Sequence, residues 1–403
     1  MQREEEAPVS NDPRLVSIVL PVFNEADSLR ELHGELRTSL AAWDRPFELV
    51  FVNDGSTDGS ASVLDELARE PNVRVVHLRR NFGQTAALTA GIDHAGGGVI
   101  AAAPLPTAAT APSGTLKVVL LGTGVGPPVN LQQYGSSTLV EAGGQRFLFD
   151  CGRGATLRLA QAGVPIGSIT RVFLTHLHSD HVIQLPDLLL TGWASGHRAV
   201  PLEIWGPAGT RAMMDHLQQA FAFDIQMRRD IDEHFPAEGI RVVSHEVRTD
   251  SIVFAEGGVT VTAFQVDHGP VQPAFGYRID YRGRSVVLSG DTRVSENLVR
   301  HAQGADVLVH EVIDPQALRE RPDRPGPAIV DAVIAHHTTP QQAGEVFRRV
   351  APRLAVYSHA PNSARVIELT RTTYAGPLQG AEDLLTILVG ARIEVLHHSP
   401  LPQ

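Results

Sequence analysis

The sequence has 403 residues, more than the roughly 250–300 residues at which a single hydrophobic core stops growing, and so predicts two domains. A formal net charge of −11 argues against a general nucleic-acid binder, and the single cysteine, Cys151, excludes a disulfide within the chain. The acidic N-terminus differs from an export signal, and no apolar run reaches the roughly 20 residues of a membrane helix, so we expect a cytoplasmic protein without a membrane partner.

Short apolar runs and amphipathic runs alternate in the first quarter of the chain. The pattern predicts strand, helix, strand, helix, strand and helix in turn, at 16–23, 26–41, 47–53, 59–69, 73–78 and 84–94. This order is typical of a partial parallel α/β sheet of the Rossmann type.

A low-complexity stretch over 95–115, rich in Gly, Ala, Pro, Thr and Ser, follows this segment and indicates a linker. Part of it resembles the end of a secretory signal, but at an internal position. We therefore predict a first segment over 1–98, a linker over 99–115 and a second domain over 116–403.

The second domain begins with strands in pairs and continues with strands and helices interleaved. Strands are expected at 117–121, 137–141, 145–149, 171–175, 201–205, 240–247, 251–255, 258–267, 275–281, 284–289, 306–310, 353–358 and 392–397. Helices are expected at 182–195, 208–221, 295–303, 340–350 and 380–389. Mixed sheets with helices outside them predict a four-layer αββα sandwich.

Polar motifs end the first two strands of the N-terminal segment, at 21–25 (Pro-Val-Phe-Asn-Glu) and 52–58 (Val-Asn-Asp-Gly-Ser-Thr-Asp). The carboxyl ends of parallel strands are where open α/β sheets bind ligands. With Asn-Phe-Gly-Gln at 81–84, the segment resembles the GT-A-like, nucleotide-binding half of a family 2 glycosyltransferase. The resemblance implies that Asp54 contacts the nucleotide of a sugar donor.

The same segment lacks two parts of that family. No Asp-x-Asp follows the next strand to hold a metal on the donor diphosphate, and the acceptor half is missing. An inert remnant is therefore favoured over glycosyl transfer, and residues 53–58 also fit an Asx-type turn that caps a helix without any ligand.

A dense group of metal-binding residue types occurs in the second domain, where His176, His178, Asp180 and His181 fall between an expected strand and a helix. Strand-to-helix turns place such side chains on one rim, and imidazole with carboxylate suits zinc. A lone histidine is more often a core residue, but four ligand-type residues in this spacing predict a metal site.

Three further candidates, His268, Asp291 and His359, each follow a β-rich run. With Leu-Gly-Thr-Gly at 121–124 and Phe-Asp-Cys-Gly at 149–152, the set resembles the metallo-β-lactamase superfamily. Within it, the sequence is most similar to the ribonuclease Z-like branch, which also contains arylsulfatase-type enzymes. The resemblance spans nearly all of the second domain.

The resemblance implies a dinuclear site for two Zn²⁺ ions, with Mn²⁺ or Fe²⁺ as alternatives. One ion is expected on His176, His178 and His268 and the other on Asp180, His181 and His359, with Asp291 as the bridge. Paired ions of this kind activate water and clamp both reacting oxygens.

Two residues are assigned catalytic roles by the same resemblance. Asp180 is expected to orient or deprotonate the attacking water. His337 is expected to protonate the leaving oxygen or to stabilise charge, although its neighbour His336 is an alternative. Asp150 and Glu311 are expected to orient histidines rather than to bind metal.

The expected substrate depends on the segment between His268 and Asp291, where ribonuclease Z carries a protruding arm and this chain has only a short hairpin. Lys117 is the only lysine, and residues 221–235 fit either a lid over a small pocket or a surface helix. We therefore expect hydrolysis of a small phosphodiester or aryl sulfate ester, with a tRNA 3′ endonuclease as the alternative and glycosyl transfer third. A nucleic-acid partner and a homodimer stay open.

Overall fold

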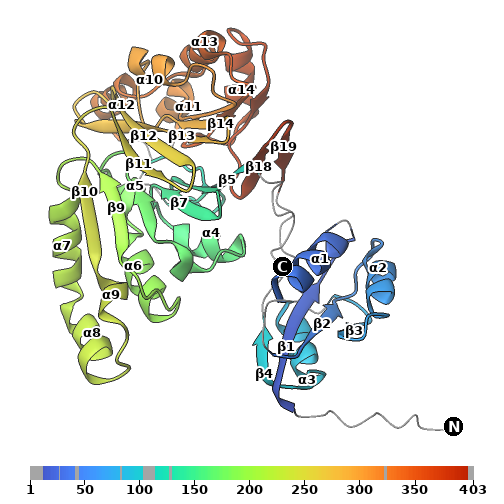
Figure 1. Cartoon of the computed structure of the whole chain (residues 1–403). Helices are drawn as coiled ribbons and strands as arrows, with labels where there is room; N and C mark the ends of the chain where they lie inside the picture. The colour runs from blue at the N-terminus through green and yellow to red at the C-terminus, as the bar shows by residue number, and fades with distance from the viewer. Residues whose placement is uncertain are drawn as a thin grey trace. The chain divides into compact units, whose positions relative to one another are not determined.

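A computed structural model describes residues 12–26, 28–40, 45–81, 84–102, 114–126, 129–321 and 325–397. The chain divides into two compact units, Met1–Thr110 and Ala111–Gln403 (Figure 1). Most of the predicted linker, residues 103–113, lies outside the described residues.

The first unit is a parallel sheet with helices on both faces. Its strands lie in the order β3-β2-β1-β4 and are β1 (Asp12–Val22), β2 (Phe47–Asn53), β3 (Val73–His77) and β4 (Gly97–Ala102). Its helices are α1 (Leu29–Leu40), α2 (Ser60–Leu67) and α3 (Gln84–Asp93). One face buries Leu49 and Leu64, and the other buries Val50 and Ala87. The predicted parallel α/β segment is confirmed.

Strand β4 corrects the predicted start of the linker. Residues 99–102 pair in parallel with β1, in the register Val16↔Val99 and Val19↔Ala102. Composition could not show this, because the pairing depends on an unpaired edge of β1 rather than on a hydrophobic period of the segment itself.

Two mixed sheets form the centre of the second unit. The first has the order β10-β9-β8-β7-β6-β5-β18-β19 in the described residues, and the second has the order β11-β12-β13-β14-β15-β16-β17. The strands of the first sheet are β5 (Leu116–Gly122), β6 (Ser137–Ala142), β7 (Gln145–Phe149), β8 (Arg171–Phe173), β9 (Leu202–Gly206), β10 (Val242–Glu246), β18 (Leu385–Val389) and β19 (Ile393–Leu396). Those of the second are β11 (Ser251–Glu256), β12 (Val259–Val266), β13 (Ala274–Tyr281), β14 (Arg284–Leu288), β15 (Val307–His310), β16 (Leu354–Tyr357) and β17 (Leu378–Gln379).

Helices cover the outer faces of both sheets (Figure 1). With the first sheet lie α4 (Ala155–Gln161), a 3₁₀ turn (Ile166–Ser168), α5 (Ser179–Val182), α6 (Leu185–Ala194), α7 (Thr210–Ala220), α8 (Ala222–Gln226), a π-helical turn (Met227–Ile231) and α9 (Ala237–Ile240). With the second lie α10 (Glu296–His301), α11 (Pro315–Glu320), α12 (Pro327–Ala335), α13 (Pro340–Val350) and α14 (Ala364–Arg371).

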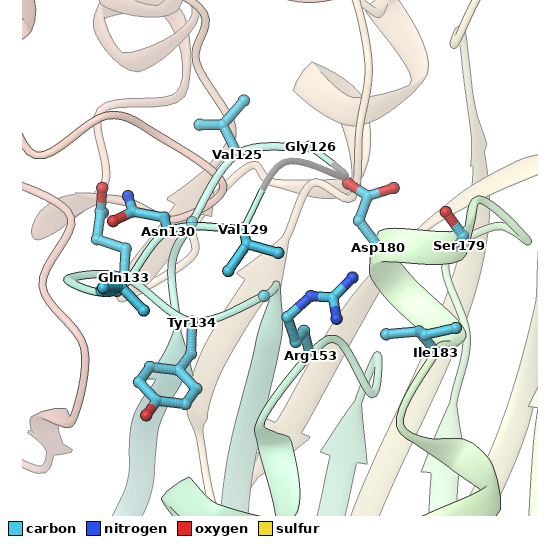
Figure 2. A pocket seen from close by; sticks show the side chains of 13 residues that line it. Val125, Gly126, Val129, Asn130, Gln133, Tyr134, Arg153, Ser179, Asp180 and Ile183 are labelled. Carbon is cyan, nitrogen blue, oxygen red and sulfur yellow. The ribbon is translucent and has the colours of Figure 1, made fainter.

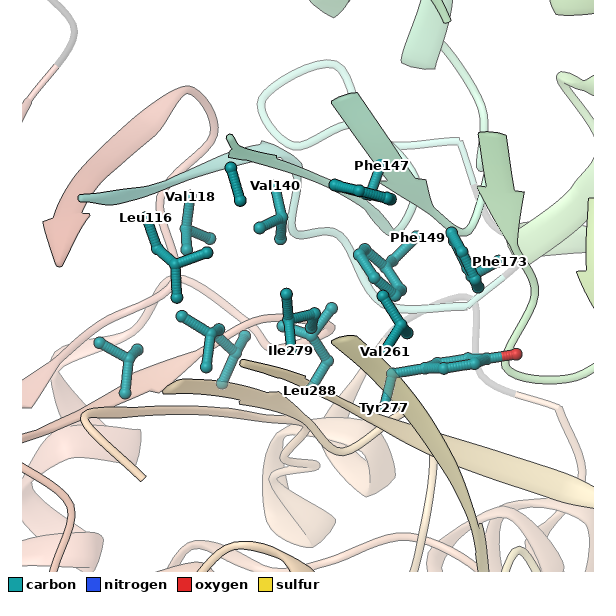
Figure 3. Packing of buried hydrophobic residues seen from close by; sticks show 14 of the residues in the cluster. Leu116, Val118, Val140, Phe147, Phe149, Phe173, Val261, Tyr277, Ile279 and Leu288 are labelled. Carbon is teal, nitrogen blue, oxygen red and sulfur yellow. The ribbon is translucent and has the colours of Figure 1, made fainter. Parts of the chain in front are cut away.

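The largest apolar cluster lies between the two sheets. Figure 3 shows Phe147, Phe149 and Phe173 from the first sheet facing Tyr277 and Ile279 from the second. Two further clusters pack the helices against the outer faces. Alternating apolar residues of the strands therefore fill both sides of each sheet, which gives the predicted αββα sandwich.

The predicted helix at 380–389 is wrong, because residues 385–389 form strand β18. This strand pairs antiparallel with both β5 and β19. Its apolar run was too short to separate a buried strand from a helix by period, and the pairing partner lies more than 250 residues away in sequence.

The structure also shows the conformation of the two segments on which the expected substrate depends. The segment 268–291 is the expected short hairpin, β13 turning into β14. Residues 221–235 include α8 and the π-helical turn, and they line neither the pocket beside Asp180 nor the cavity beside Asp291. The described residues contain no helix long and apolar enough to cross a membrane.

Candidate metal centre

The loop after β8 carries the candidate ligands His176 and His178, and helix α5 carries Asp180 and His181. Buried hydrogen bonds hold the start of this loop. Tyr277 Oη donates to the carbonyl oxygen of Leu174 at 2.7 Å, and the Thr175 amide donates to Asp150 Oδ1 at 2.8 Å. Both Tyr277 and Asp150 are buried. The loop therefore leaves the sheet in one fixed direction.

Three histidines meet at one side of this loop. His176 Nε2 lies 2.9 Å from His178 Nδ1, and His268 Nε2 lies 3.5 Å from the same atom. Burial lowers the pKa of His268 to about 4 and also lowers the pKa values of His176 and His178. Neutral rings keep a free lone pair at pH 7, which is the form that binds a metal ion.

A second group forms around Asp180, His181 and His359, whose ligand atoms lie within 4.8 Å of one another. Asp180 Oδ2 lies 3.3 Å from His359 Nε2 and 3.6 Å from His181 Nε2. Asp291 lies between the two groups, since its carboxylate is 3.3 Å from His181 Nε2, 3.3 Å from His359 Nδ1 and 3.9 Å from His176 Nε2.

Neighbouring groups fix the orientation of the rings. His181 Nδ1 donates to Asp150 Oδ2 at 2.8 Å, and His268 Nδ1 donates to the carbonyl oxygen of His336 at 3.0 Å. Each contact assigns the proton to Nδ1 and leaves Nε2 as the ligand atom. Asp150 therefore holds both the loop and one histidine.

Buried ligand atoms without a hydrogen-bond partner indicate whether a cation fits the cluster. His181 Nε2, Asp291 Oδ1 and His359 Nδ1 are buried and have no hydrogen-bond partner in the described residues. Buried polar atoms are normally paired, so three convergent unpaired ligand atoms match the donor set of a divalent metal ion. The residues present fit a metal centre of mixed imidazole and carboxylate ligands.

The charged groups of the cluster shift the pKa values of its two carboxylates. Burial alone raises the pKa of Asp180, but the contact with His359 and the charge of His181 outweigh it and lower that pKa to about 2. Burial likewise opposes ionisation of Asp291, yet His359 and His181 hold its pKa well below the usual range. Both carboxylates are ionised at neutral pH, as metal binding requires.

His337 lies at the edge of the cluster and is paired with Glu311. Its Nδ1 lies 3.3 Å from Glu311 Oε1. Burial lowers the pKa of His337, but the Glu311 carboxylate outweighs it and raises that pKa to about 9. Glu311 is held by the amides of Thr292 and Thr338. His336 instead supplies its backbone carbonyl to His268, although its ring is also within reach of that group.

The backbone is strained at two of these positions. Asp150 and His359 adopt φ values of 57° and 48°, in the left-handed region that residues with a Cβ rarely occupy. Gly290, just before Asp291, has φ 60°, and a Cβ there would lie 2.6 Å from the Phe275 carbonyl oxygen. Strain of this kind is often concentrated at functional sites.

The structure thus brings together the seven residues predicted as metal ligands, and places His337 beside them. Asp54 belongs to the other unit, where its amide donates to Val22 O at 2.8 Å. Around it, Asn53 Oδ1 accepts the Ser56 amide and Asn24 Oδ1 accepts the Thr57 amide. The Asn53–Ser56 bond is local to the predicted turn, whereas the other two bonds join this turn to the end of β1 and the residues after it.

The sequence did not predict the pocket beside Asp180. A pocket of about 160 Å³ opens beside Asp180 and is lined by the loop after β5 together with Arg153 and Ile183 (Figure 2). The signal available was Arg153 itself, a charged residue directly after the Asp-Cys-Gly motif. Its place beside the cluster depends on tertiary packing.

Comparisons with known proteins agree with this geometry. Residues 145–360 match the family model of the Beta-lactamase superfamily domain, and residues 17–102 match that of Glycosyl transferase family 2. The chain is 35% identical to Ribonuclease Z of Mycobacterium marinum (strain ATCC BAA-535 / M) over 285 residues, which cover 69% of this chain and 100% of the relative. It is 39% identical to Ribonuclease Z of Mycolicibacterium gilvum (strain PYR-GCK) over 246 residues, 60% of this chain and 84% of the relative.

Solved structures give the same result. The short form of human tRNase Z is 26% identical with a TM-score of 0.51, covering 67% of this chain and 98% of that chain. A metallo-beta-lactamase fold protein from Bacillus subtilis is 19% identical with a TM-score of 0.53, covering 68% of this chain and 99% of that chain. The second likeness is evidence for the fold alone.

Proposed function

Because this chain belongs to the beta-lactamase superfamily and is a metal-dependent hydrolase of ester bonds, we propose that it cleaves RNA at the 3′ end of precursor tRNA, as a ribonuclease Z-type endonuclease. The single observation that carries this proposal is the likeness to a ribonuclease Z over that relative's whole length. The convergence of imidazole and carboxylate groups around Asp291 supplies the matching chemistry.

The chain's own residues suit phosphodiester hydrolysis. Asp180 is ionised and lies beside His359, which supports assigning it to orient the attacking water and accept its proton. His337 is protonated at neutral pH through its pairing with Glu311, and it is assigned to donate a proton to the leaving oxygen. Glu311 acts through His337 as a positioning residue.

His176, His178 and His268 would hold one Zn²⁺ ion, and Asp180, His181 and His359 a second, with Asp291 shared. When bound, the two ions would supply Lewis-acid polarisation and water activation. Asp150 would keep the His181 ring aligned for this role.

The earlier preference for a small ester loses its main support. The expectation that tRNA is not the substrate depends on the short β13–β14 hairpin. The alignment with the Mycobacterium marinum relative spans 285 residues, all of that protein and 69% of this chain, so the relative carries no long arm that this chain lacks. The hairpin therefore does not distinguish this chain from its ribonuclease Z relative, and hydrolysis of RNA is favoured over hydrolysis of a small ester.

A substrate panel on the full chain tests the proposal. We expect a precursor tRNA with a 3′ trailer to be cleaved more efficiently than bis(p-nitrophenyl) phosphate or p-nitrophenyl sulfate. A chelator should abolish cleavage, and added Zn²⁺ should restore it. The ions also bind only the folded state, so their removal should lower the melting temperature.

Matched histidine variants control for general damage. His176→Ala should lose metal and activity, whereas His216→Ala, an exposed histidine on α7, should retain both. Cleavage of tRNA that survives complete metal removal would falsify the mechanism. Turnover of the sulfate or small phosphodiester with no cleavage of tRNA would instead support the small-ester alternative.

A further inference from the structure

The pocket beside Asp180 differs in chemistry from the metal centre. Among the described lining residues, Arg153 carries the only positive charge, and its side chain is exposed. Figure 2 shows the guanidinium of Arg153 between Val129 and Ile183, facing into the pocket. The pocket also reaches Asp180, so a molecule bound there lies next to the reacting groups.

Arg153 has no hydrogen-bond or ion-pair partner for its side chain in the described part of the chain. The nearby Arg158 differs, because it pairs with Asp383 at 2.9 Å and lies 4.2 Å from the ring centre of Tyr134. Arg158 is therefore structural, whereas the planar guanidinium of Arg153 is available to a phosphate group.

The rest of the lining suits a nucleobase. Val129 and Ile183 are 68% and 48% exposed and offer two apolar walls. Asn130 Oδ1 accepts the Gln132 amide at 2.9 Å, and its Nδ2 has no partner in the described residues. Gln133 is not available, since its Nε2 donates to Thr123 and to the Ala360 carbonyl oxygen.

We propose that this pocket binds the nucleotide next to the scissile phosphate of a single-stranded RNA 3′ end. Arg153 contacts the phosphate of that nucleotide, and the base lies against Val129, with Asn130 Nδ2 donating to the edge of the base. The inference rests on the proposed function. A small ester such as bis(p-nitrophenyl) phosphate has one phosphate, which reacts at the metal centre, so it leaves Arg153 without a partner.

Arg153→Ala in the full chain tests the assignment on two substrates. We expect kcat/KM for a precursor tRNA to fall about tenfold, mainly through KM, because one phosphate contact is lost. Turnover of bis(p-nitrophenyl) phosphate should stay within about twofold, because that substrate makes no such contact. Arg392→Ala is the matched control: it removes the same charge from the β18–β19 turn, outside the pocket, and should change neither rate.

Binding gives a readout that is independent of cleavage. A fluorescent 2′-O-methyl RNA tetranucleotide should bind Arg153→Ala about tenfold more weakly, with the slope of log affinity against log salt reduced by about 0.7. Asn130→Ala should weaken binding without changing that slope. Arg392→Ala should leave both affinity and slope as in the original protein.

The outcomes separate this inference from the proposed function. Equal losses of Arg153→Ala on tRNA and on bis(p-nitrophenyl) phosphate would place the arginine on the reacting phosphate and overturn the pocket assignment. Unchanged tRNA kinetics and unchanged tetranucleotide affinity would also overturn it. A protein that binds the tetranucleotide through Arg153 but cleaves no tRNA would keep the pocket and refute the endonuclease.

Discussion

Asp150 shows how one buried carboxylate serves several parts of the site. It accepts the Thr175 amide, the Thr175 hydroxyl and His181 Nδ1, all from a strained backbone position. Charged acceptors of this kind form stronger hydrogen bonds than neutral ones. Asp150 therefore fixes the ligand loop and one ligand ring together, although it is not itself among the candidate ligands.

Replacing Asp150 with Asn should weaken zinc binding about 10- to 100-fold, because an amide no longer accepts the His181 proton as a carboxylate does. Competition with a chromogenic chelator measures this affinity. Asp187→Asn is the control: Asp187 accepts from Thr156 and Thr191 but contacts no histidine among the described residues. It should leave zinc affinity unchanged, and an unaltered affinity in Asp150→Asn would refute the positioning role.

At the scale of elements, β5 and β6 are joined by an ion pair that involves the only lysine of the sequence. Lys117 Nζ lies 2.9 Å from Glu141 Oε2, and Arg146 Nε lies 2.8 Å from Glu141 Oε1. Burial raises the pKa of Glu141, but the two cations outweigh it and lower that pKa below its usual 4.5. The pairing therefore stabilises the folded state above that pH and is lost as the pH falls below it.

Lys117→Met should lower the free energy of unfolding by about 1 kcal/mol at pH 7, with a smaller effect at pH 3, because Glu141 takes up protons as the pH falls. Urea denaturation at the two pH values measures both effects. Arg241→Met is the control, because its pair with Glu238 is more than half exposed and should contribute little. An equal loss at both pH values would contradict the assignment to Glu141.

Strand β18 marks the limit of prediction at this scale. Its five apolar and β-branched residues gave no clear period, and they were assigned to a helix. Pairing with β5 and β19 makes this segment a strand, because the backbone N–H and C=O groups of a central strand bond to those of its neighbours. In contrast, β2 and β7 and helix α13 have the predicted bounds, since each combines a clear pattern with flanking turn or capping residues.

At the scale of the whole molecule, the residues of the metal centre all come from the second unit, and its cores are formed within that unit. A variant that lacks residues 1–113 should therefore keep its zinc content and its turnover of bis(p-nitrophenyl) phosphate within about twofold. Metal analysis and steady-state kinetics check this. Loss of zinc in the truncated variant would show that the first unit contributes to the site.

The sequence by itself predicted the two families, the αββα class and the candidate ligands, because motifs and strand periods are local properties that the chain carries in any context. Only the tertiary structure decided how Asp291 lies between the two ligand groups, how Glu311 pairs with His337, and that Arg153 faces the pocket beside Asp180. These relations join residues from different strands and loops, and packing of two sheets, rather than any local pattern, sets the distances between them.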